Sequence, residues 1–500
     1  MDLIDFIILL LLIPILTTFY FRRRSNLPST SDNLPPGPPG WPLVGNLFQV
    51  ALQRRPFMYI VRDLRSKYGP IFTMRMGQRT LIIVTSSDLI HQALIHHGPL
   101  FASRPPDSPT RLLFSSHKCT INSSEYGPLW RSLRRNFVSE IVSPSRVRSF
   151  SWIRDWAISN HLSRLRNQQL NHGFIHIMPN CRLTICSILV CICFGAKVPE
   201  TLVADIESVL KDVMMMTTLK LPDFLPSLSP LFRHHLNKAK NLRNRQMNCL
   251  LPLVRARRAF VNGSTSSTEF EMVSGVGDAY IDSLFSLEPP GRGKLGEEEL
   301  VTLCSEVMSA GTDTSATALE WAMAHLVLDQ DAQEKVYKEV VKEKEVESMG
   351  YLLAVVKETL RRHPPSHFVL SHAATRETEL GGYRVPAGVN VEFYTAWVTE
   401  DPAVWTEPGE WRPERFLEGG EGWEVDVTGK RGVHMMPFGV GRRICPAASL
   451  GMLHVQLMLA RMVREFRWLP VNGEKPDLTE TFAFTVVMKD PLRAVVVERG

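Results

Sequence analysis

The residues with the clearest chemical potential lie in one short loop near the C-terminus: Phe438-Gly439-Val440-Gly441-Arg442-Arg443-Ile444-Cys445-Pro446-Ala447. Cys445 supplies a thiol, and a helical pattern over residues 448–466 begins just after it. A thiolate in front of a helix is stabilised by the helix N-terminal amides and by nearby cations such as Arg443. Gly439 and Gly441 allow the loop to turn beside a flat group. A buried structural cysteine is the alternative, but the whole pattern meets the requirements of a cysteine that ligates haem iron.

The loop resembles the haem-binding loop of the cytochrome P450 family, Phe-x-x-Gly-x-Arg-x-Cys-x-Gly. Only Ala447 departs from it, because it stands where glycine is usual. The resemblance implies that Cys445 is the ligand of haem b iron, that Arg443 contacts the haem and that Phe438 shields one face. A thiolate ligand donates electron density to the iron and favours O–O cleavage.

A second candidate pair lies on a predicted helix over residues 128–137. Trp130 and Arg134 are four residues apart, so they share one helix face. The pairing is common on protein surfaces, but here it resembles the C-helix signature of the same family. That resemblance implies that both side chains hold a haem propionate, and it adds His372 to the predicted haem contacts.

One long helical pattern covers residues 297–328, with Ala310-Gly311-Thr312-Asp313-Thr314-Ser315 at its centre. Glycine and threonine are poor helix formers, and threonine hydroxyls can bond to the carbonyl four residues back, so the helix is expected to open locally. The alternative is that these residues only weaken the helix locally and that packing against its neighbours compensates for this. The segment matches the I-helix motif of the family, which implies a groove for O2 at Ala310 and Gly311. It also implies that Thr314 and Asp313 form an acid–alcohol pair that relays protons.

Three charged residues are assigned to structure and not to catalysis. Glu358 and Arg361 lie three apart on a predicted helix, and Arg415 belongs to the run Pro413-Glu414-Arg415-Phe416. In the family such a Glu-x-x-Arg pair is buried with this third partner. Separately, apolar residues in segments that contact substrate in the family form the predicted pocket wall, with ordinary core packing as the alternative for each: Phe114, Val307, Met308, Val369, Leu370, Phe482 and Phe484.

Composition excludes some classes of function. The net charge of +6 over 500 residues is modest and scattered, which does not favour nucleic-acid binding. The eight cysteines show no disulfide or zinc spacing, so we expect reduced core thiols in a reducing compartment.

The N-terminus predicts a membrane anchor. Residues 3–21 are almost continuously apolar and long enough to cross a bilayer, and Arg22-Arg23-Arg24 follows. No small-residue cleavage site supports a signal peptide, and the positive-inside rule places the rest of the chain in the cytosol. We expect a signal anchor with its basic stop over 1–24, a proline-rich hinge over 25–46 and a catalytic domain over 47–500. This predicts a single-pass protein of the endoplasmic reticulum.

The resemblance spans nearly the whole chain and implies a mainly α fold with a small β region. Strands are predicted around Gly77-Gln78-Arg79 as a hairpin, and at the C-terminus as a pair between residues 482–488 and 493–497. The segment 335–351 is shorter than the family pattern, which puts stability in doubt more than chemistry.

The implied activity is that of a microsomal monooxygenase of the plant A-type. It would use O2, a small apolar substrate and electrons from NADPH through a membrane-bound reductase. The reductase is acidic in the family, which suits basic residues at Arg131, Arg135, Arg442 and Arg443. Within the family, the sequence most resembles plant enzymes that hydroxylate or epoxidise fatty acids within the chain. Alternatives are another plant secondary metabolite as substrate, a haem-thiolate isomerase or dehydratase, and a haem-binding membrane protein without turnover.

Overall fold

The structure is a computed structural model that describes residues 33–226, 232–263, 271–272 and 279–499. The predicted anchor and the start of the hinge, residues 1–32, lie outside this range. Within it, one helix, α9, is long and apolar enough to cross a membrane, but 78% of it is buried inside the protein.

Helices make up most of the described chain. In order they are α2 (Leu47–Leu52), α3 (Phe57–Tyr68), α4 (Ser87–His91), η1 (Gln92–His96), α5 (Pro109–Phe114), α6 (Pro128–Phe137), η2 (Val138–Val142), α7 (Pro144–Ser149), α8 (Ser151–His172), α9 (Ile177–Phe194), α10 (Glu200–Thr217), α11 (Leu221–Phe224), α12 (Arg233–Val261), α13 (Tyr280–Phe285), α14 (Glu297–Leu328), α15 (Gln330–Lys342), η5 (Val346–Ser348), α16 (Gly350–Arg362), α17 (Thr395–Glu400), η6 (Pro413–Phe416), η7 (Gly441–Arg443), α18 (Ala448–Glu465) and η8 (Val471–Gly473). A mainly α fold with small sheets is therefore confirmed.

The strands form one four-stranded sheet and several small ones. They are β1 (Ile71–Met76), β2 (Arg79–Val84), β3 (Ile175–His176), β4 (Ala196–Lys197), β5 (Glu271–Met272), β6 (His372–Ala373), β7 (Thr378–Leu380), β8 (Tyr383–Val385), β9 (Asn390–Phe393), β10 (Phe466–Pro470), β11 (Glu480–Ala483), β12 (Thr485–Met488) and β13 (Arg493–Glu498). The largest sheet has the order β1-β2-β9-β6, with β1 and β2 antiparallel and β2 and β9 parallel. The predicted hairpin is β1–β2, which turns at Gly77 with a φ of 61°.

The predicted C-terminal strand pair is wrong. Residues 480–488 fold back on themselves as the β11–β12 hairpin, because Phe484 turns with a φ of 72° and brings Phe482 opposite Val486. Strand β13 instead pairs with β10 and β3, where alternate residues such as Ala494 are buried.

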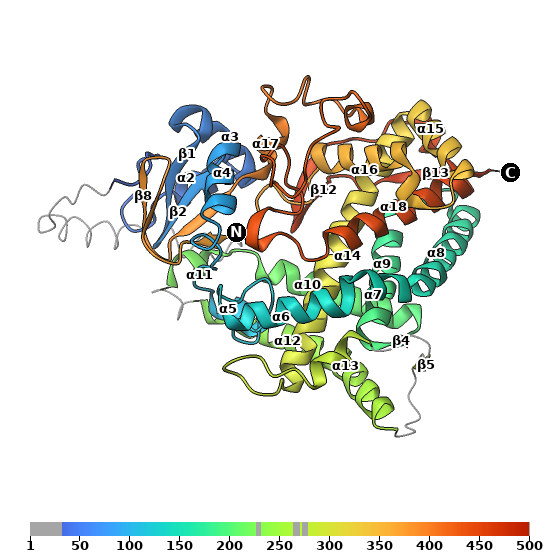
Figure 1. Ribbon diagram of the computed structural model, residues 1–500, viewed down its shortest axis with the longest axis horizontal. Coiled ribbons are helices and arrows are strands. Elements are labelled where there is room, and N and C mark those ends of the chain that lie inside the picture. Colours follow the sequence, from blue (N-terminus) through green and yellow to red (C-terminus); the bar gives the residue numbers. More distant parts are fainter. Residues whose placement is uncertain (1–32, 227–231, 264–270, 273–278, 500) are drawn as a thin grey trace, which may run out of the picture.

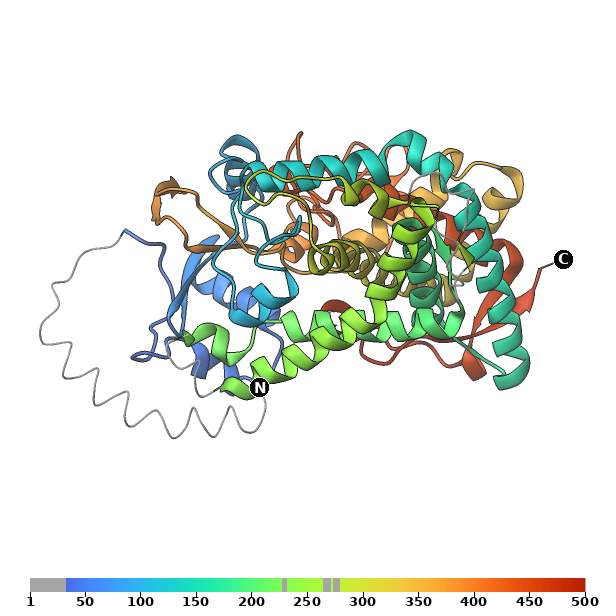
Figure 2. The same cartoon turned by 90° about the horizontal axis from the view of Figure 1, so that it is seen from below.

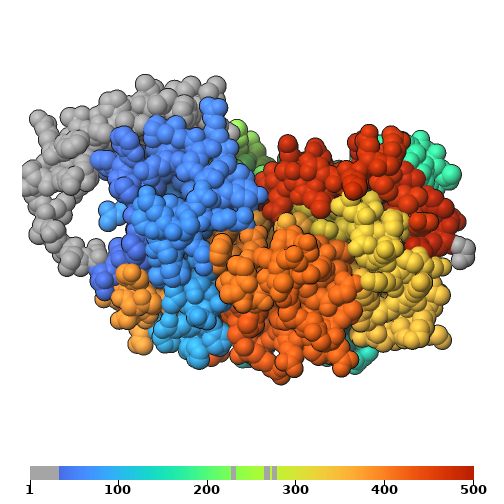
Figure 3. Space-filling model, turned by 90° about the horizontal axis from the view of Figure 1, so that it is seen from above, coloured from blue at the N-terminus to red at the C-terminus, as the bar shows by residue number. Residues whose placement is uncertain are grey.

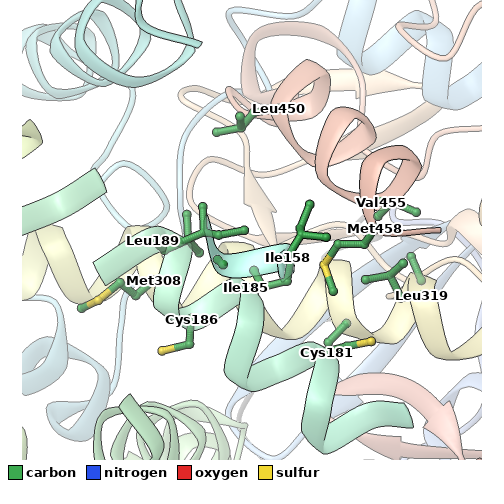
Figure 4. Close-up of a cluster of buried hydrophobic side chains, with 14 of the residues drawn as sticks. Ile158, Cys181, Ile185, Cys186, Leu189, Met308, Leu319, Leu450, Val455 and Met458 are labelled. Atoms are coloured by element: carbon green, nitrogen blue, oxygen red, sulfur yellow. The ribbon is translucent and has the colours of Figure 1, made fainter. Parts of the chain in front are cut away.

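Helix α14 runs through the middle of the helical part (Figure 1). Its 32 residues begin where Glu299 accepts the backbone N–H of Gly296 at 3.0 Å, and acidic residues fill its first turn, where they suit the helix dipole. Figure 4 shows side chains of α8, α9, α14 and α18 meeting in the main core, among them Ile158, Cys186 and Met458. Most residues of α9 are apolar and buried, which suits a helix that packs against these neighbours on several sides.

The sheet-rich N-terminal part lies at one end of the molecule. Figures 2 and 3 show the blue segment that contains β1 and β2 at that end, and in Figure 3 residues of the C-terminal half, in yellow, orange and red, cover most of the rest of the face.

The short segment between α15 and α16 connects the two helices without a long loop. Glu339 on α15 accepts the backbone N–H groups of Tyr351 and Leu352, at 2.9 and 2.8 Å, and so caps the start of α16. Lys335 and Tyr351 both contact the Glu414 carboxylate, at 2.7 and 3.0 Å. Residues of the shortened segment thus provide the cap of the helix that follows.

Candidate haem site

The Cys445 loop is held in a tight conformation. The N–H of Cys445 donates to the carbonyl of Phe438 at 2.8 Å. Gly441 has a φ of 73°, and a Cβ there would lie 2.1 Å from the carbonyl oxygen of Leu94, so only glycine fits. Ala447, by contrast, has a φ of −105°. The position does not need glycine, which explains why the departure from the family pattern is tolerated.

The loop does not by itself make Cys445 a thiolate. Burial raises the pKa of the thiol, while the N–H of Ala447 and the positive charge of Arg134 lower it, and burial is the stronger effect. A coordinated metal ion deprotonates a thiol outright. The cysteine therefore suits a role as a metal ligand better than one as a free nucleophile.

Basic side chains from two elements meet beside the loop. Arg134 on α6 donates to the Ile444 carbonyl at 2.6 Å, next to Cys445. Arg443 donates to the Ala102 carbonyl at 2.7 Å and lies over the ring of Trp130, 4.7 Å from its centroid. The structure thus brings together the predicted haem contacts Trp130, Arg134 and Arg443.

A further cation, Arg104, belongs to the same region, and the sequence analysis missed it. Its guanidinium donates to the carbonyls of Asn122, at 2.6 Å, and of Leu370 and Ser371, at 2.8 Å each. Burial lowers its pKa to about 10. It lies in an Arg-Pro-Pro run and does not share a helix or a motif with any other candidate residue, so no sequence pattern could have identified it.

This cluster fits the two propionates of a haem. None of the three guanidiniums, Arg104, Arg134 and Arg443, forms an ion pair within the described part of the chain. Burial and the charges of the other two lower the pKa of Arg443 to about 8, which Glu306 offsets only in part. The buried Nε1–H of Trp130 has no hydrogen-bond partner. An anionic group would satisfy both the excess charge and the unpaired donor.

His372 lies close to the cluster but is already engaged. Its Nδ1 donates to the Phe101 carbonyl at 2.6 Å, and burial lowers its pKa well below the usual value. A neutral imidazole that donates from Nδ1 can only accept at Nε2. His372 would therefore bind a propionate only when protonated, so its predicted role stays a prediction.

The centre of α14 contains the predicted hydroxyl. Thr314 donates to the carbonyl of Ala310 at 2.7 Å, and Ala310 is exposed within a helix that is otherwise largely buried. Gly311 lies against α9, since a Cβ there would approach Leu189 to 2.7 Å. The absence of a side chain at Gly311 allows α9 and α14 to pack closely. Its role in an O2 groove stays a prediction.

The predicted acid–alcohol pair is not in contact. One oxygen of Asp313 accepts from Arg182 on α9, and the other accepts from the Thr485 hydroxyl at 2.8 Å. Asp313 is buried, with a side-chain exposure of 4%. Arg182 is the second functional candidate that the sequence analysis missed, because it lies far away in the chain.

The predicted pocket residues are in different surroundings. Leu370 and Phe482 are 55% and 49% exposed. Phe114 is buried in a small cluster with α10 and α12, whereas Met308 is fully buried in the main core (Figure 4). The remaining members are buried or half-buried: Val307, Val369 and Phe484. Their role in binding substrate stays a prediction.

The predicted structural triad is assembled. Arg361 makes two bonds to the Glu358 carboxylate, at 2.7 and 2.8 Å, and Arg415 approaches the same carboxylate at 3.3 Å. The side chains of Glu358 and Arg361 are fully buried and that of Arg415 nearly so. Glu358 and Arg361 belong to α16 and Arg415 to η6, so the triad joins these two elements where they pack together.

The chain is similar to known proteins along almost its whole length. The family model described as Cytochrome P450 matches residues 35–496. "Cytochrome P450 89A9" of Arabidopsis thaliana is 35% identical over 98% of this chain and 99% of its own length. "Flavonoid 3'-monooxygenase" of Petunia hybrida is 30% identical over 95% of this chain and 93% of its own. A retinoic-acid-bound cyanobacterial CYP120A1 has the same fold, with a TM-score of 0.74 at 20% identity, covering 93% of this chain and 99% of that one.

A helical fold with a cysteine loop, a cation cluster and a threonine-bearing central helix defines a haem-thiolate oxidoreductase. The chain belongs to the cytochrome P450 family. It is a monooxygenase with haem b as its cofactor, O2 and a small molecule as substrates, and NADPH supplied through a reductase. The similarity to plant enzymes is consistent with the A-type.

Proposed function

We propose that the chain inserts one oxygen atom of O2 into a small apolar molecule at a haem ligated by Cys445. Trp130, Arg134 and Arg443 would hold the propionates, together with Arg104. When bound, the haem would supply the redox chemistry of O2. The residues of this chain would hold it, exclude water and provide protons.

The observation that carries this proposal is the position of the Thr314 hydroxyl. It lies 2.7 Å from the carbonyl of Ala310, an exposed residue in the middle of α14. A threonine there can hold and pass on a proton. Haem-thiolate isomerases and dehydratases do not consume O2 and need no such group. The position therefore favours a monooxygenase over these alternatives and over a haem-binding protein without turnover.

For the substrate we propose a fatty acid that is hydroxylated or epoxidised within its chain. An apolar wall selects a hydrocarbon by area, at roughly 25 cal/mol per Å2 buried, and fixes the reacting carbon only loosely. Mixed positional products are then expected. Phe114 with Val209 and Val213 of α10 forms an apolar cluster that suits such a wall.

A second substrate class is favoured by the relatives. Among them are proteins named "Flavonoid 3'-monooxygenase" of Petunia hybrida and "Tabersonine 16-hydroxylase 1" of Catharanthus roseus, whose names give a flavonoid and tabersonine as substrates. An aromatic secondary metabolite is thus the alternative to a fatty acid. Both classes would bury apolar surface on binding, so the choice between them is left to experiment.

The location we propose is the endoplasmic reticulum membrane, with one span over residues 1–24, a hinge over 25–46 and the catalytic domain, 47–500, in the cytosol beside membrane lipid. Arg131, Arg135 and Arg442 are exposed. They would attract an acidic reductase to the face that carries the cysteine loop.

The experiment that tests this function uses the haem-loaded full chain with reductase and NADPH. Lauric acid and a flavonoid aglycone are supplied separately, and oxygenated product is measured by mass spectrometry. Product from lauric acid supports the first substrate class, and product from the flavonoid alone replaces it with the second. If neither is oxidised while NADPH is consumed, the substrate proposals fail.

A further inference from the structure

An open cavity lies away from the candidate haem site, where α14 ends and α15 begins. Its volume is about 670 Å3. His325, which lines the cavity, follows Thr314 by eleven residues on the same helix, and this separates the two by about 16 Å along the helix axis. The proposed oxygen chemistry therefore does not use this cavity.

The wall of the cavity carries three carboxylates, those of Asp329, Asp331 and Glu410. No lysine or arginine is among the described residues that line it. Arg412 partly compensates Glu410, at 3.6 Å, but neither aspartate forms a salt bridge within the described ranges of the chain. Two negative charges thus face the cavity without a cationic partner.

Neighbouring charges do not reverse this excess. The ammonium of Lys335, one turn beyond Asp331, is bound to Glu414 at 2.7 Å. Arg362 donates to the carbonyl of Gly409 at 2.9 Å and is one further positive charge nearby. The dipoles of α14 and α15 offset each other, because the negative end of the first helix and the positive end of the second meet at the cavity. The carboxylates remain in excess and favour a cation.

A buried histidine adds an acceptor to the same cavity. His325 is 7% exposed, and its Nε2 lies 2.9 Å from Nε2 of His363, whose Nδ1 lies 2.9 Å from the Glu480 carboxylate. Burial lowers the pKa of both histidines well below the usual value, so both are neutral. Because His363 donates to the carboxylate of Glu480, it can only accept from His325. The second nitrogen of His325, Nδ1, is therefore an acceptor.

This Nδ1 is open to the cavity. No group in the described part of the chain donates to it, and it is not among the polar atoms that are closed off from solvent. The His325 ring lies parallel to the ring of Trp411, with centroids 4.6 Å apart, and the bond to His363 fixes it further. A fixed, unpaired acceptor on a largely buried side chain calls for an N–H or O–H donor from the cavity.

The lining favours an alkylammonium ion over a metal ion. Among the described residues no three ligating side chains surround one point closely enough to hold a metal. An ammonium group brings three N–H donors and can spread its contacts over separate acceptors. Leu328, Trp411 and Leu478 provide an apolar wall for the methylene groups that join two such ions.

We propose that this cavity binds a short aliphatic diammonium ion. One ammonium group donates to Nδ1 of His325, and the carboxylates of Asp329 and Asp331 compensate the two positive charges. The site is independent of the reaction at Cys445, so its occupancy does not depend on which substrate the enzyme oxidises.

The first test is isothermal titration calorimetry of the haem-loaded full chain in a non-ionic detergent. The probe is 1,4-diaminobutane, compared with butylamine, which has one charge, and with 1,4-butanediol, which has none. The diamine should bind at one site, butylamine several-fold more weakly, and the diol without measurable heat. Absence of diamine binding, or equal binding of the three probes, overturns the proposal.

A second readout separates the cavity from the haem. Because an amine can also ligate haem iron, the Soret band is followed during the same titration, and binding in the cavity should leave it unshifted. Binding that shifts the Soret band in step with the heat would place the amine on the iron and overturn the proposal.

Variants of the lining complete the test. His325→Gln keeps a donor towards His363 but loses the acceptor at Nδ1, so the diamine should bind about tenfold more weakly. Asp331→Asn, at an exposed position that does not threaten folding, should weaken binding several-fold. Glu334→Gln is the matched control, because Glu334 lies on the same helix but pairs with Arg499, at 2.9 Å, outside the cavity. It should bind as wild type does.

The comparison of Asp331→Asn with Glu334→Gln decides the matter even if His325→Gln does not fold. Equal affinity of these two variants for 1,4-diaminobutane overturns the proposal. Failure to oxidise either probe substrate of the monooxygenase reaction would leave this binding unchanged, so the two proposals fail separately.

Discussion

Asp313 and Thr314 are neighbours in sequence but belong to different hydrogen-bond networks. Thr314 donates to Ala310 within its own helix, whereas Asp313 accepts from Arg182 on α9 and from Thr485 at the start of β12. The Thr314 hydroxyl thus lies beside the exposed residue Ala310 of α14, whereas the Asp313 carboxylate lies in the protein interior.

The first prediction follows from this separation. Thr314→Ala removes the hydroxyl but no contact of Asp313, so folding and substrate binding should persist. Proton delivery should fail more often, with more peroxide and less product per NADPH. The comparison is the product-to-NADPH ratio against Thr317→Ala, which changes a buried hydroxyl one turn further along α14, bonded to Thr485 at 3.0 Å. An equal ratio in the wild type and Thr314→Ala would remove Thr314 from the mechanism.

The second prediction concerns the unpaired donor of Trp130. Trp130→Phe keeps an aromatic ring but deletes the Nε1–H that we assign to a propionate. A hydrogen bond to a charged group contributes about 1.5–3 kcal/mol, so haem should dissociate at least about tenfold faster. Transfer of haem to apomyoglobin measures this rate. Trp152→Phe is the matched control, because Trp152 also has a buried Nε1 without a partner but lies on α8. Equal rates in both variants would contradict the assignment.

The third prediction tests the buried triad. Glu358→Gln leaves Arg361 and Arg415 without the carboxylate that they share, which should cost about 3–5 kcal/mol and prevent a stable haem-loaded protein. Glu414→Gln changes a neighbouring glutamate whose pair with Lys335 is about half exposed. That change should cost less than about 1 kcal/mol. Thermal unfolding of the two variants gives the comparison, and a Glu358→Gln protein as stable as wild type would refute the structural role.

The fourth prediction is a pH dependence caused by Glu320. Burial raises the pKa of this carboxyl to about 7, with only the N–H of Leu492 to offset it. Because the folded-state pKa lies above the unfolded value, the group favours folding less and less as pH rises from about 4.5 to 7. Glu320→Gln keeps the acceptor but cannot ionise. It should equal wild type near pH 4.5 and exceed it by up to about 3 kcal/mol above pH 7.

Urea unfolding at a series of pH values measures this difference. Glu345→Gln, at an exposed position, is the control and should give a difference that does not change with pH. A Glu320→Gln curve parallel to that of wild type would show that Glu320 does not titrate in this range.

The sequence predicted the elements that depend on local pattern. Helix α14 has the predicted bounds, since its capping glutamate and apolar periodicity lie within the segment, and α6 places Trp130 and Arg134 on one face for the same reason. The partner of β13 was missed because strand pairing is decided by long-range burial and by the turn at Phe484. Arg104 and Arg182 were missed because their partners are distant in the chain and ordinary in type.

The reduced-CO difference spectrum reports directly whether Cys445 supplies the thiolate ligand of the haem iron. Wild type should show the red-shifted band of a thiolate-ligated haem. Cys445→His should bind haem but lose this band, because imidazole donates less electron density than a thiolate. Cys304→Ser, which changes another buried cysteine, on α14, should keep it. A red-shifted band that survives in Cys445→His would show that Cys445 is not the ligand.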